Sequence, residues 1–167
     1  SNRVPLMVGV AGHRNICPED VAALKARVRE VFRELRQRCP HTPLVLLSPL
    51  NEGADRLVAE VALEREFGVS LIAVLSWPKD IFPEGHFRSG DRAEFDRLLA
   101  NAADVIYVPL DEAENVRAED LPHCDKSQRA QYRYVGKLIA RHSQLLIALW
   151  DGVETEESAA GRVIRWQ

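Results

Sequence analysis

Cysteine is scarce in this chain of 167 residues, and its three copies, Cys17, Cys39 and Cys124, lie far apart. An odd number of cysteines without a C-x-x-C pair argues against a disulfide framework and fits a reducing cytoplasm. The five histidines form no H-x-x-x-H pair either, so we expect no metal site.

Long apolar runs are absent as well, because no stretch approaches the roughly 20 residues that span a membrane, and no signal-peptide pattern is visible. The net charge of −3 gives the chain no overall attraction to nucleic acid or anionic lipid. These absences predict a cytoplasmic protein, or the cytoplasmic domain of a membrane-associated one, that does not favour nucleic acid as a partner.

Two common phosphate-binding fingerprints are missing. The segment Gly9-Val10-Ala11-Gly12-His13-Arg14 is not G-x-G-x-x-G, and no G-x-x-x-x-G-K-[ST] occurs anywhere in the chain. The sequence therefore predicts neither a bound dinucleotide cofactor nor a P-loop, and we expect no cofactor.

What the chain does contain is an alternation of short Val-, Ile- and Leu-rich runs with helical patterns. Apolar runs that hardly alternate with polar residues are typical of strands buried on both faces. The pattern predicts a single α/β domain over 1–167, Rossmann-like and doubly wound, with a mainly parallel sheet of five or slightly more strands and helices on both faces. The predicted strands cover residues 6–10, 44–47, 70–75, 105–108 and 145–150, and the predicted helices cover residues 18–36, 54–67, 91–102 and a segment around 132–139.

Two connections that leave strands are long, over residues 76–90 and 109–127, whereas the connections from helices back to strands are short. In a parallel sheet every strand-to-helix connection lies at the same edge, which we call the carboxyl edge. Ligands of open α/β sheets bind there, so we expect the functional site at the carboxyl edge.

The clearest candidate site is the turn Ser48-Pro49-Leu50-Asn51-Glu52-Gly53-Ala54-Asp55-Arg56, which joins a strand to a helix. Unpaired N–H groups and the positive dipole end of a helix favour phosphate. Glu52 is suited to accept hydrogen bonds from ribose hydroxyls, and the alternative for Asn51 and Asp55 is ordinary helix capping. We therefore expect Asn51, Glu52, Gly53, Ala54 and Asp55 to bind a ligand.

Further candidates come from the other strand ends. Gly12 permits close approach to the backbone, and Arg14, next to His13, can pair with phosphate unless it is simply solvated. Trp77 and Trp150 can stack on a base, although core packing is the alternative for Trp77. The remaining predicted ligand-binding residues are Arg133, near the start of a helix, and the pair Asp151 and Gly152.

Three of these stretches resemble the SLOG superfamily, which includes the Smf (DNA-processing) and Lonely Guy (cytokinin-activating) proteins. They are Val8 to Arg14, Glu52 to Arg56 and Ile147 to Gly152. The likeness is greatest to bacterial conflict or defence domains that stand at the N-terminus of larger proteins. The resemblance implies a homo-oligomeric sensor that binds a nucleotide-derived signal such as ADP-ribose and regulates an attached effector domain or membrane segment.

Lonely Guy enzymes carry a Pro-Gly-Gly-x-Gly-Thr-x-x-Glu motif, and the corresponding stretch Glu157 to Gly161 lacks its glycine pair and threonine. We therefore predict no catalytic residues. One alternative is a nucleotide phosphoribohydrolase in which Glu52 stabilises the ribose cation and Asp55 or Asp151 moves the proton. Another is an oligomerisation or DNA-contacting module, suggested by the basic helix face from Lys25 to Arg36, for which a solvated amphipathic face is the alternative.

Overall fold

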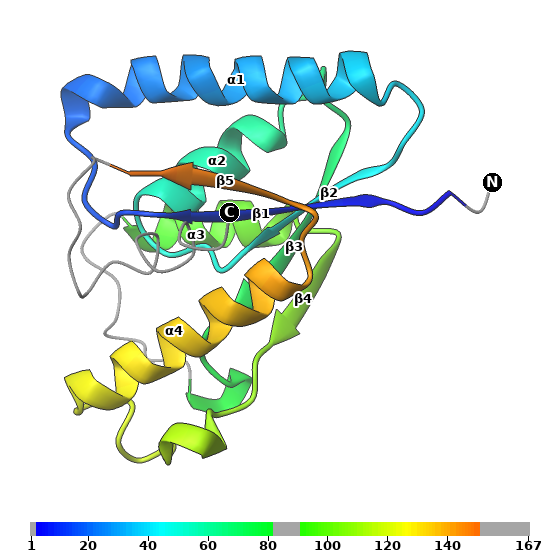
Figure 1. Ribbon diagram of the computed structural model, residues 1–167. Coiled ribbons are helices and arrows are strands. Elements are labelled where there is room, and N and C mark those ends of the chain that lie inside the picture. Colours follow the sequence, from blue (N-terminus) through cyan, green and yellow to red (C-terminus); the bar gives the residue numbers. More distant parts are fainter. Residues whose placement is uncertain (1–2, 82–90, 151–167) are drawn as a thin grey trace.

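The computed structural model describes residues 3–81 and 91–150. Its centre is a five-stranded sheet in the order β4-β3-β2-β1-β5, and every neighbouring pair is parallel (Figure 1). The predicted Rossmann-like α/β architecture is therefore confirmed. The strands are β1 (Leu6–Gly12), β2 (Leu44–Ser48), β3 (Val69–Leu75), β4 (Asp104–Tyr107) and β5 (Leu145–Leu149).

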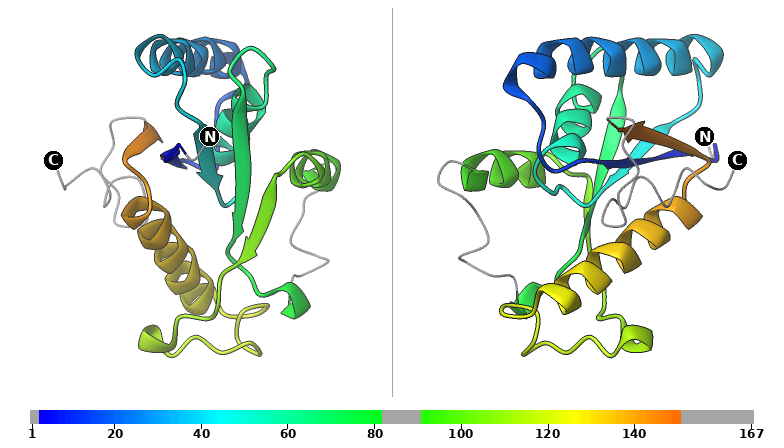
Figure 2. Two further views of the ribbon diagram at one scale, coloured as in Figure 1. Left: turned by 90° about the vertical axis from the view of Figure 1, so that its right-hand side faces the viewer. Right: turned by 60° about the vertical axis from the view of Figure 1, so that its left-hand side comes forward.

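Helices cover both faces of this sheet, as predicted. Three of them, α1 (Val21–Arg38), α2 (Ala54–Ala62) and α3 (Asp91–Ala100), lie on one face, and α4 (Asp125–Arg141) lies on the other (Figure 2). Short 3₁₀ turns precede α1 and interrupt the long connections. They are η1 (Pro18–Asp20), η2 (Lys79–Ile81) and η3 (Glu112–Glu114).

Each face has its own apolar core. Phe32 of α1 and Val58 of α2 are fully buried against Val8 and Leu46 on the first face. Val135 and Ile139 of α4 pack against the second face. Full burial of such a side chain contributes about 1.5–3 kcal/mol, so the apolar stripes of the helices hold the two layers onto the sheet.

The order of the strands reverses between β1 and β5. From β1 the chain passes through α1 to β2 on one side, whereas α4 crosses the opposite face and delivers β5 to the other side of β1. Gly12 pairs with Leu149 at the end of this register. Such a switch point opens a crevice outside the carboxyl ends of the strands, which lies where the site was predicted.

Some element boundaries differ from the prediction. Strand β1 continues through Gly12, which was expected in a loop, because pairing with β5 extends that far. Helix α2 ends at Ala62 rather than at Phe67, and the following turn lets Phe67 pack 5.6 Å from the ring of Phe32. Helix α4 begins inside the polar segment that was expected to be a loop.

Among the helices of residues 3–81 and 91–150, none combines the length and the apolar character that crossing a bilayer requires.

Candidate functional site at the carboxyl edge

Two predicted loops meet directly at the carboxyl edge. The N–H of Ala54, at the start of α2, donates a hydrogen bond of 3.0 Å to the carbonyl oxygen of His13. Gly53 has a φ of +89°, and a Cβ on it would lie 2.2 Å from the carbonyl oxygen of Arg14. A Cβ on Gly12 would lie 2.4 Å from Cβ of Ala54. Both glycines are therefore required for this contact between the loops.

The turn between β2 and α2 has an unusual conformation. Leu50 is buried and has a φ of 55°, a region that is uncommon for residues with a side chain. Its N–H donates to Oγ of Ser48 at 3.2 Å, and its carbonyl accepts from Nε of Arg56 at 3.0 Å. These two bonds hold the Leu50 backbone in place and thereby fix the position of the loop that follows.

Arg56 itself is an anchoring residue. It is buried, and its Nη1 lies 3.3 Å from a carboxylate oxygen of Glu94 and 3.8 Å from one of Asp91. Its guanidinium also lies over the ring of Phe95, 5.8 Å from the centroid. Because Asp91 and Glu94 belong to α3, Arg56 ties the Leu50 turn to that helix.

Asp55 points inward and is 7% exposed. Burial raises the pKa of its carboxyl to about 7, although hydrogen bonds from Asn51 and the charges of Arg56 and Arg14 lower it. These bonds from Asn51 close the turn on itself, but they do not cap α2, because its N-cap residue is Gly53 and no side chain caps it.

The open side of this turn forms a small hollow at the ends of β2 and β3. Its cavity volume is about 30 Å³, which holds about two water molecules and is far below the roughly 300–1,000 Å³ of a small-molecule pocket. The hollow is lined by Arg14, Pro49, Leu50, Asn51, Glu52, Arg56, Leu75, Ser76, Trp77, Asp91 and Phe95.

Ser76, which directly follows β3, lines this hollow although the sequence did not single it out. Its side chain is 3% exposed, and its Oγ has no hydrogen-bond partner among residues 3–81 and 91–150. An unsatisfied buried hydroxyl costs about 1–3 kcal/mol. This group therefore indicates a position where a polar group of a ligand or a water molecule would be bound.

The structure brings together several of the predicted ligand-binding residues. Arg14, Asn51 and Glu52 line the one hollow. Ala54 is buried at the first turn of α2, where its Cβ would meet any side chain at Gly12. The ligand-binding role of these residues stays a prediction, and Asp151 and Gly152, which were expected at the same site, lie outside the described residues.

The aromatic and helical candidates lie differently. Trp77 is 3% exposed and donates its indole N–H to the hydroxyl of Tyr132 at 3.2 Å. It packs in a third small core with Val116 and Leu121, which corresponds to the packing alternative rather than to an open stacking surface. Arg133 lies half-buried on α4 and does not line the hollow.

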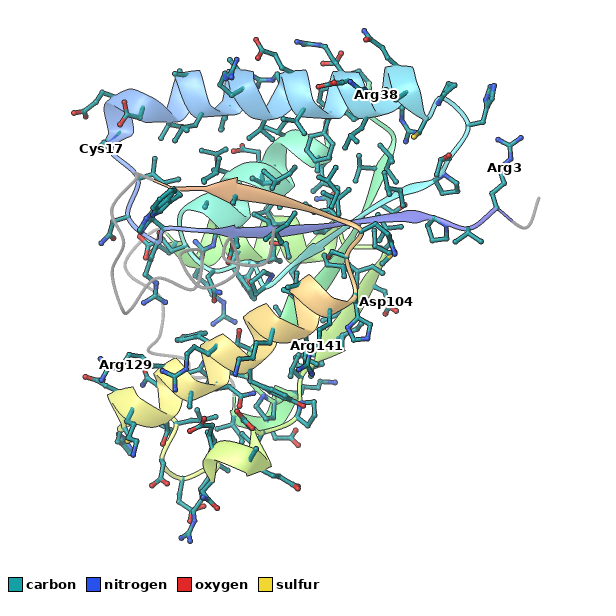
Figure 3. All side chains as sticks on the ribbon, viewed as in Figure 1. Arg3, Cys17, Arg38, Asp104, Arg129 and Arg141 are labelled. Carbon is teal, nitrogen blue, oxygen red and sulfur yellow. The ribbon has the colours of Figure 1, made fainter. Side chains whose placement is uncertain are left out.

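The basic face of α1, which suggested a DNA-contacting module, is neutralised within the protein. Lys25 forms an ion pair with Glu60 at 2.5 Å, and Arg29 forms a bidentate ion pair with the carboxylate of Glu64. Arg36 donates to carbonyl oxygens, including that of Phe67. A second group of cations lies on α4, which carries Arg129 in its first half, the predicted candidate Arg133, and Arg141 at its end (Figure 3).

Comparison with known proteins supports the fold. No family model and no curated protein sequence matches the chain. Among solved structures, DNA processing protein A (DprA) from Streptococcus pneumoniae matches with a TM-score of 0.57 and 16% identity over 96% of this chain and 47% of its own. DNA processing protein A from Helicobacter pylori, whose structure concerns its unique single-stranded DNA binding mode, matches with a TM-score of 0.54 and 20% identity over 95% of this chain and 60% of its own.

The chain thus spans about half the length of the solved structures it matches. At 16% and 20% identity these likenesses show a shared Rossmann-like fold, and membership of the SLOG superfamily stays a prediction. They also correct two expectations. The prediction of a sensor for a nucleotide-derived small molecule, and the prediction that nucleic acid is not a partner, are wrong, because these fold neighbours fit the DNA-contacting alternative better. The assignment to defence-type domains and the homo-oligomer stay predictions.

Proposed function

We propose that this domain contacts single-stranded DNA at its carboxyl edge and binds one backbone phosphate in the hollow beside Arg14 and Ser76. The proposal is supported by the neighbour whose structure concerns single-stranded DNA binding. The observation that carries it is the buried Ser76 hydroxyl, which lacks a partner among the described residues and lines the same hollow as Arg14.

The dimensions of the hollow favour a strand over a free nucleotide. A volume of about 30 Å³ is too small to enclose a base and a sugar. One phosphate of a chain can enter it while the remaining nucleotides lie outside on the surface. Phosphate contacts of this kind contribute affinity and position the strand on the protein, but they do not distinguish the bases. We therefore expect the affinity to depend little on the base sequence of the strand.

The donors around the hollow suit an anion. The guanidinium of Arg14 can bind phosphate oxygens with two parallel N–H bonds. The Ser76 hydroxyl and the side-chain amide of Asn51 supply neutral donors from two other sides. Glu52 is also in the lining, and its carboxylate would accept from a base or an amine rather than touch the phosphate.

Fluorescence anisotropy with a labelled oligothymidine of roughly 30 nucleotides, at about 50 mM salt, tests the proposal. Arg14→Gln should weaken binding about tenfold, because a charge-assisted bond contributes about 1.5–3 kcal/mol. Arg27→Gln is the matched control, since Arg27 on α1 is 80% exposed, carries the same charge and lies on a helix outside the site.

Ser76→Ala separates binding from stability. If the hydroxyl binds phosphate, this variant should bind the oligonucleotide several-fold more weakly. It should also unfold at a higher denaturant concentration, because the substitution removes an unsatisfied buried hydroxyl. Absence of binding by the native protein, or equal binding by Arg14→Gln and Arg27→Gln, would overturn the proposal.

A further inference from the structure

Helix α4 carries its positive charge in one row. Lys126, Arg129, Arg133, Lys137 and Arg141 follow one another at intervals of three or four residues, and Asp125 is the only acidic residue in the helix. Such spacing places side chains on one helical face. Val135 and Ile139 are buried against the sheet on the opposite face of the helix, so the row, which we call the α4 cation row, faces away from the protein.

The cation row differs from the basic face of α1 in how its charges are balanced. On α1, the exposed residues Arg27, Arg33 and Arg38 each lie within 4 Å of a glutamate. Within residues 3–81 and 91–150, no ion pair involves Lys126, Arg133, Lys137 or Arg141. The positive charges of these four residues are therefore available to an outside polyanion, whereas the charges of Arg27, Arg33 and Arg38 on α1 are already compensated.

The first half of α4 adjoins the proposed phosphate site. Arg14 of the hollow lies with its guanidinium carbon 5.9 Å from the centroid of the Tyr132 ring. Trp77, another residue of the lining, donates its indole N–H to the hydroxyl of Tyr132. Because Arg129 and Arg133 flank Tyr132 in the helix, the first half of the cation row adjoins the hollow. The row continues along α4 to Arg141 at the other end of the helix (Figure 3).

We propose that the α4 cation row is the track along which the backbone of a bound single strand leaves the hollow. Between Lys126 and Arg141 a helix rises about 22 Å, enough to follow several consecutive phosphates of a flexible strand. The proposal rests on the proposed function and adds to it a second, purely electrostatic surface on the face of the sheet opposite α1. Contacts between cations and phosphates release counterions from the DNA, so the number of phosphate contacts can be measured from the dependence of the binding constant on salt concentration.

Two triple variants with the same change of charge test the track. One replaces Lys126, Lys137 and Arg141 on α4 with glutamine, and the control replaces Arg27, Arg33 and Arg38 on α1 with glutamine. Each variant is titrated with an oligothymidine of about 4 nucleotides, which covers little beyond the hollow, and with one of about 30. Thermal unfolding of both variants verifies that these exposed substitutions leave the fold intact.

The α4 variant should bind the long oligonucleotide about tenfold more weakly. The magnitude of its slope of log K against log salt should fall by about 2, since each of the three lost phosphate contacts contributes about 0.7 for a single strand. This variant should leave the short oligonucleotide unaffected, and the α1 variant should keep the native slope. Equal behaviour of the two triple variants toward the long strand would overturn the track while leaving the hollow intact.

If the native protein binds neither oligonucleotide, the proposed function and the track fail together. A further arm uses vesicles of phosphatidylserine and phosphatidylcholine, because a basic helix face also attracts anionic lipid. A loss of vesicle binding in the α4 variant with unchanged DNA binding would overturn the track and assign the row to a membrane surface.

Discussion

The guanidinium carbon of Arg14 lies 5.9 Å from the centroid of the Tyr132 ring. Arg14 directly follows the segment after strand β1, and Tyr132 belongs to α4. Helix α4 leads into β5, the strand that pairs with β1 on the side away from β2. This contact therefore bridges the topological switch point. It places Arg14 of the hollow next to the helix that carries the cation row, so that the two proposed DNA contacts adjoin each other.

Gly53→Ala should destabilise the protein strongly. A φ of +89° is strained for alanine, and its Cβ would lie 2.2 Å from the carbonyl oxygen of Arg14. We expect the free energy of unfolding, measured with urea, to fall by about 3 kcal/mol. Gly136→Ala in α4 is the control, since nothing lies within 4 Å of the added Cβ, and it should stabilise by about 1 kcal/mol. Equal effects of the two substitutions would contradict the packing argument.

Arg56→Met should also reduce stability, although a methionine fills most of the same space. The substitution leaves the buried carbonyl of Leu50 without the bond that it accepts at 3.0 Å. An unsatisfied group of this kind costs about 1–3 kcal/mol, and we expect a loss of about 2 kcal/mol in urea unfolding. Arg27→Gln removes only an exposed pair with Glu30 and should cost less than about 0.5 kcal/mol. A loss for Arg56→Met no greater than that would show that the anchor is dispensable.

Asp55→Asn should change how stability depends on pH. Burial raises the pKa of the native carboxyl to about 7 from its ordinary value of 3.8, so the native state binds this proton more tightly than the unfolded chain. The stability that this proton confers is complete below pH 3.8 and is lost as the pH rises through about 7.

Asparagine cannot ionise, so Asp55→Asn should become more stable relative to the native protein between about pH 5 and pH 8, by about 3 kcal/mol. Urea unfolding of both proteins across this range measures the difference. Curves that stay parallel with pH would mean that the buried carboxyl of Asp55 does not titrate in this window.

Much of the fold could be predicted from the sequence because burial on both faces leaves an unambiguous pattern. The runs at Leu44–Ser48 and Val69–Leu75 hardly alternate, and they form two of the central strands of the sheet. Long loops indicated the carboxyl edge for the same reason, since parallel strands place all such loops together. Boundaries were less predictable, because the extension of β1 to Gly12 depends on pairing with Leu149, far away in the chain.

The site was only partly predictable. Arg14 and Glu52 were identified because they follow strands, and they do line one hollow. Ser76 carried no sequence signal, since a serine at the end of a strand becomes notable only when its hydroxyl is buried without a partner. The basic residues of α1 attracted attention although Lys25 and Arg29 each pair with a glutamate 35 positions away. Such pairing is invisible to local spacing.

Two substitutions at Tyr132 separate its ring from its hydroxyl. Tyr132→Leu removes the aromatic surface under Arg14, and a cation–π contact at a partly exposed position contributes about 0.5–1 kcal/mol. We expect this variant to bind oligothymidine two- to fivefold more weakly.

Tyr132→Phe keeps the ring and should retain native affinity. It deprives the indole N–H of Trp77 of its acceptor at 3.2 Å and should therefore lower the free energy of unfolding by about 1 kcal/mol. Anisotropy titration and urea unfolding of both variants measure the two effects independently. If Tyr132→Phe weakened binding as much as Tyr132→Leu, the hydroxyl rather than the ring would position Arg14, and the surface joining the hollow to α4 would depend on the hydrogen bond to Trp77.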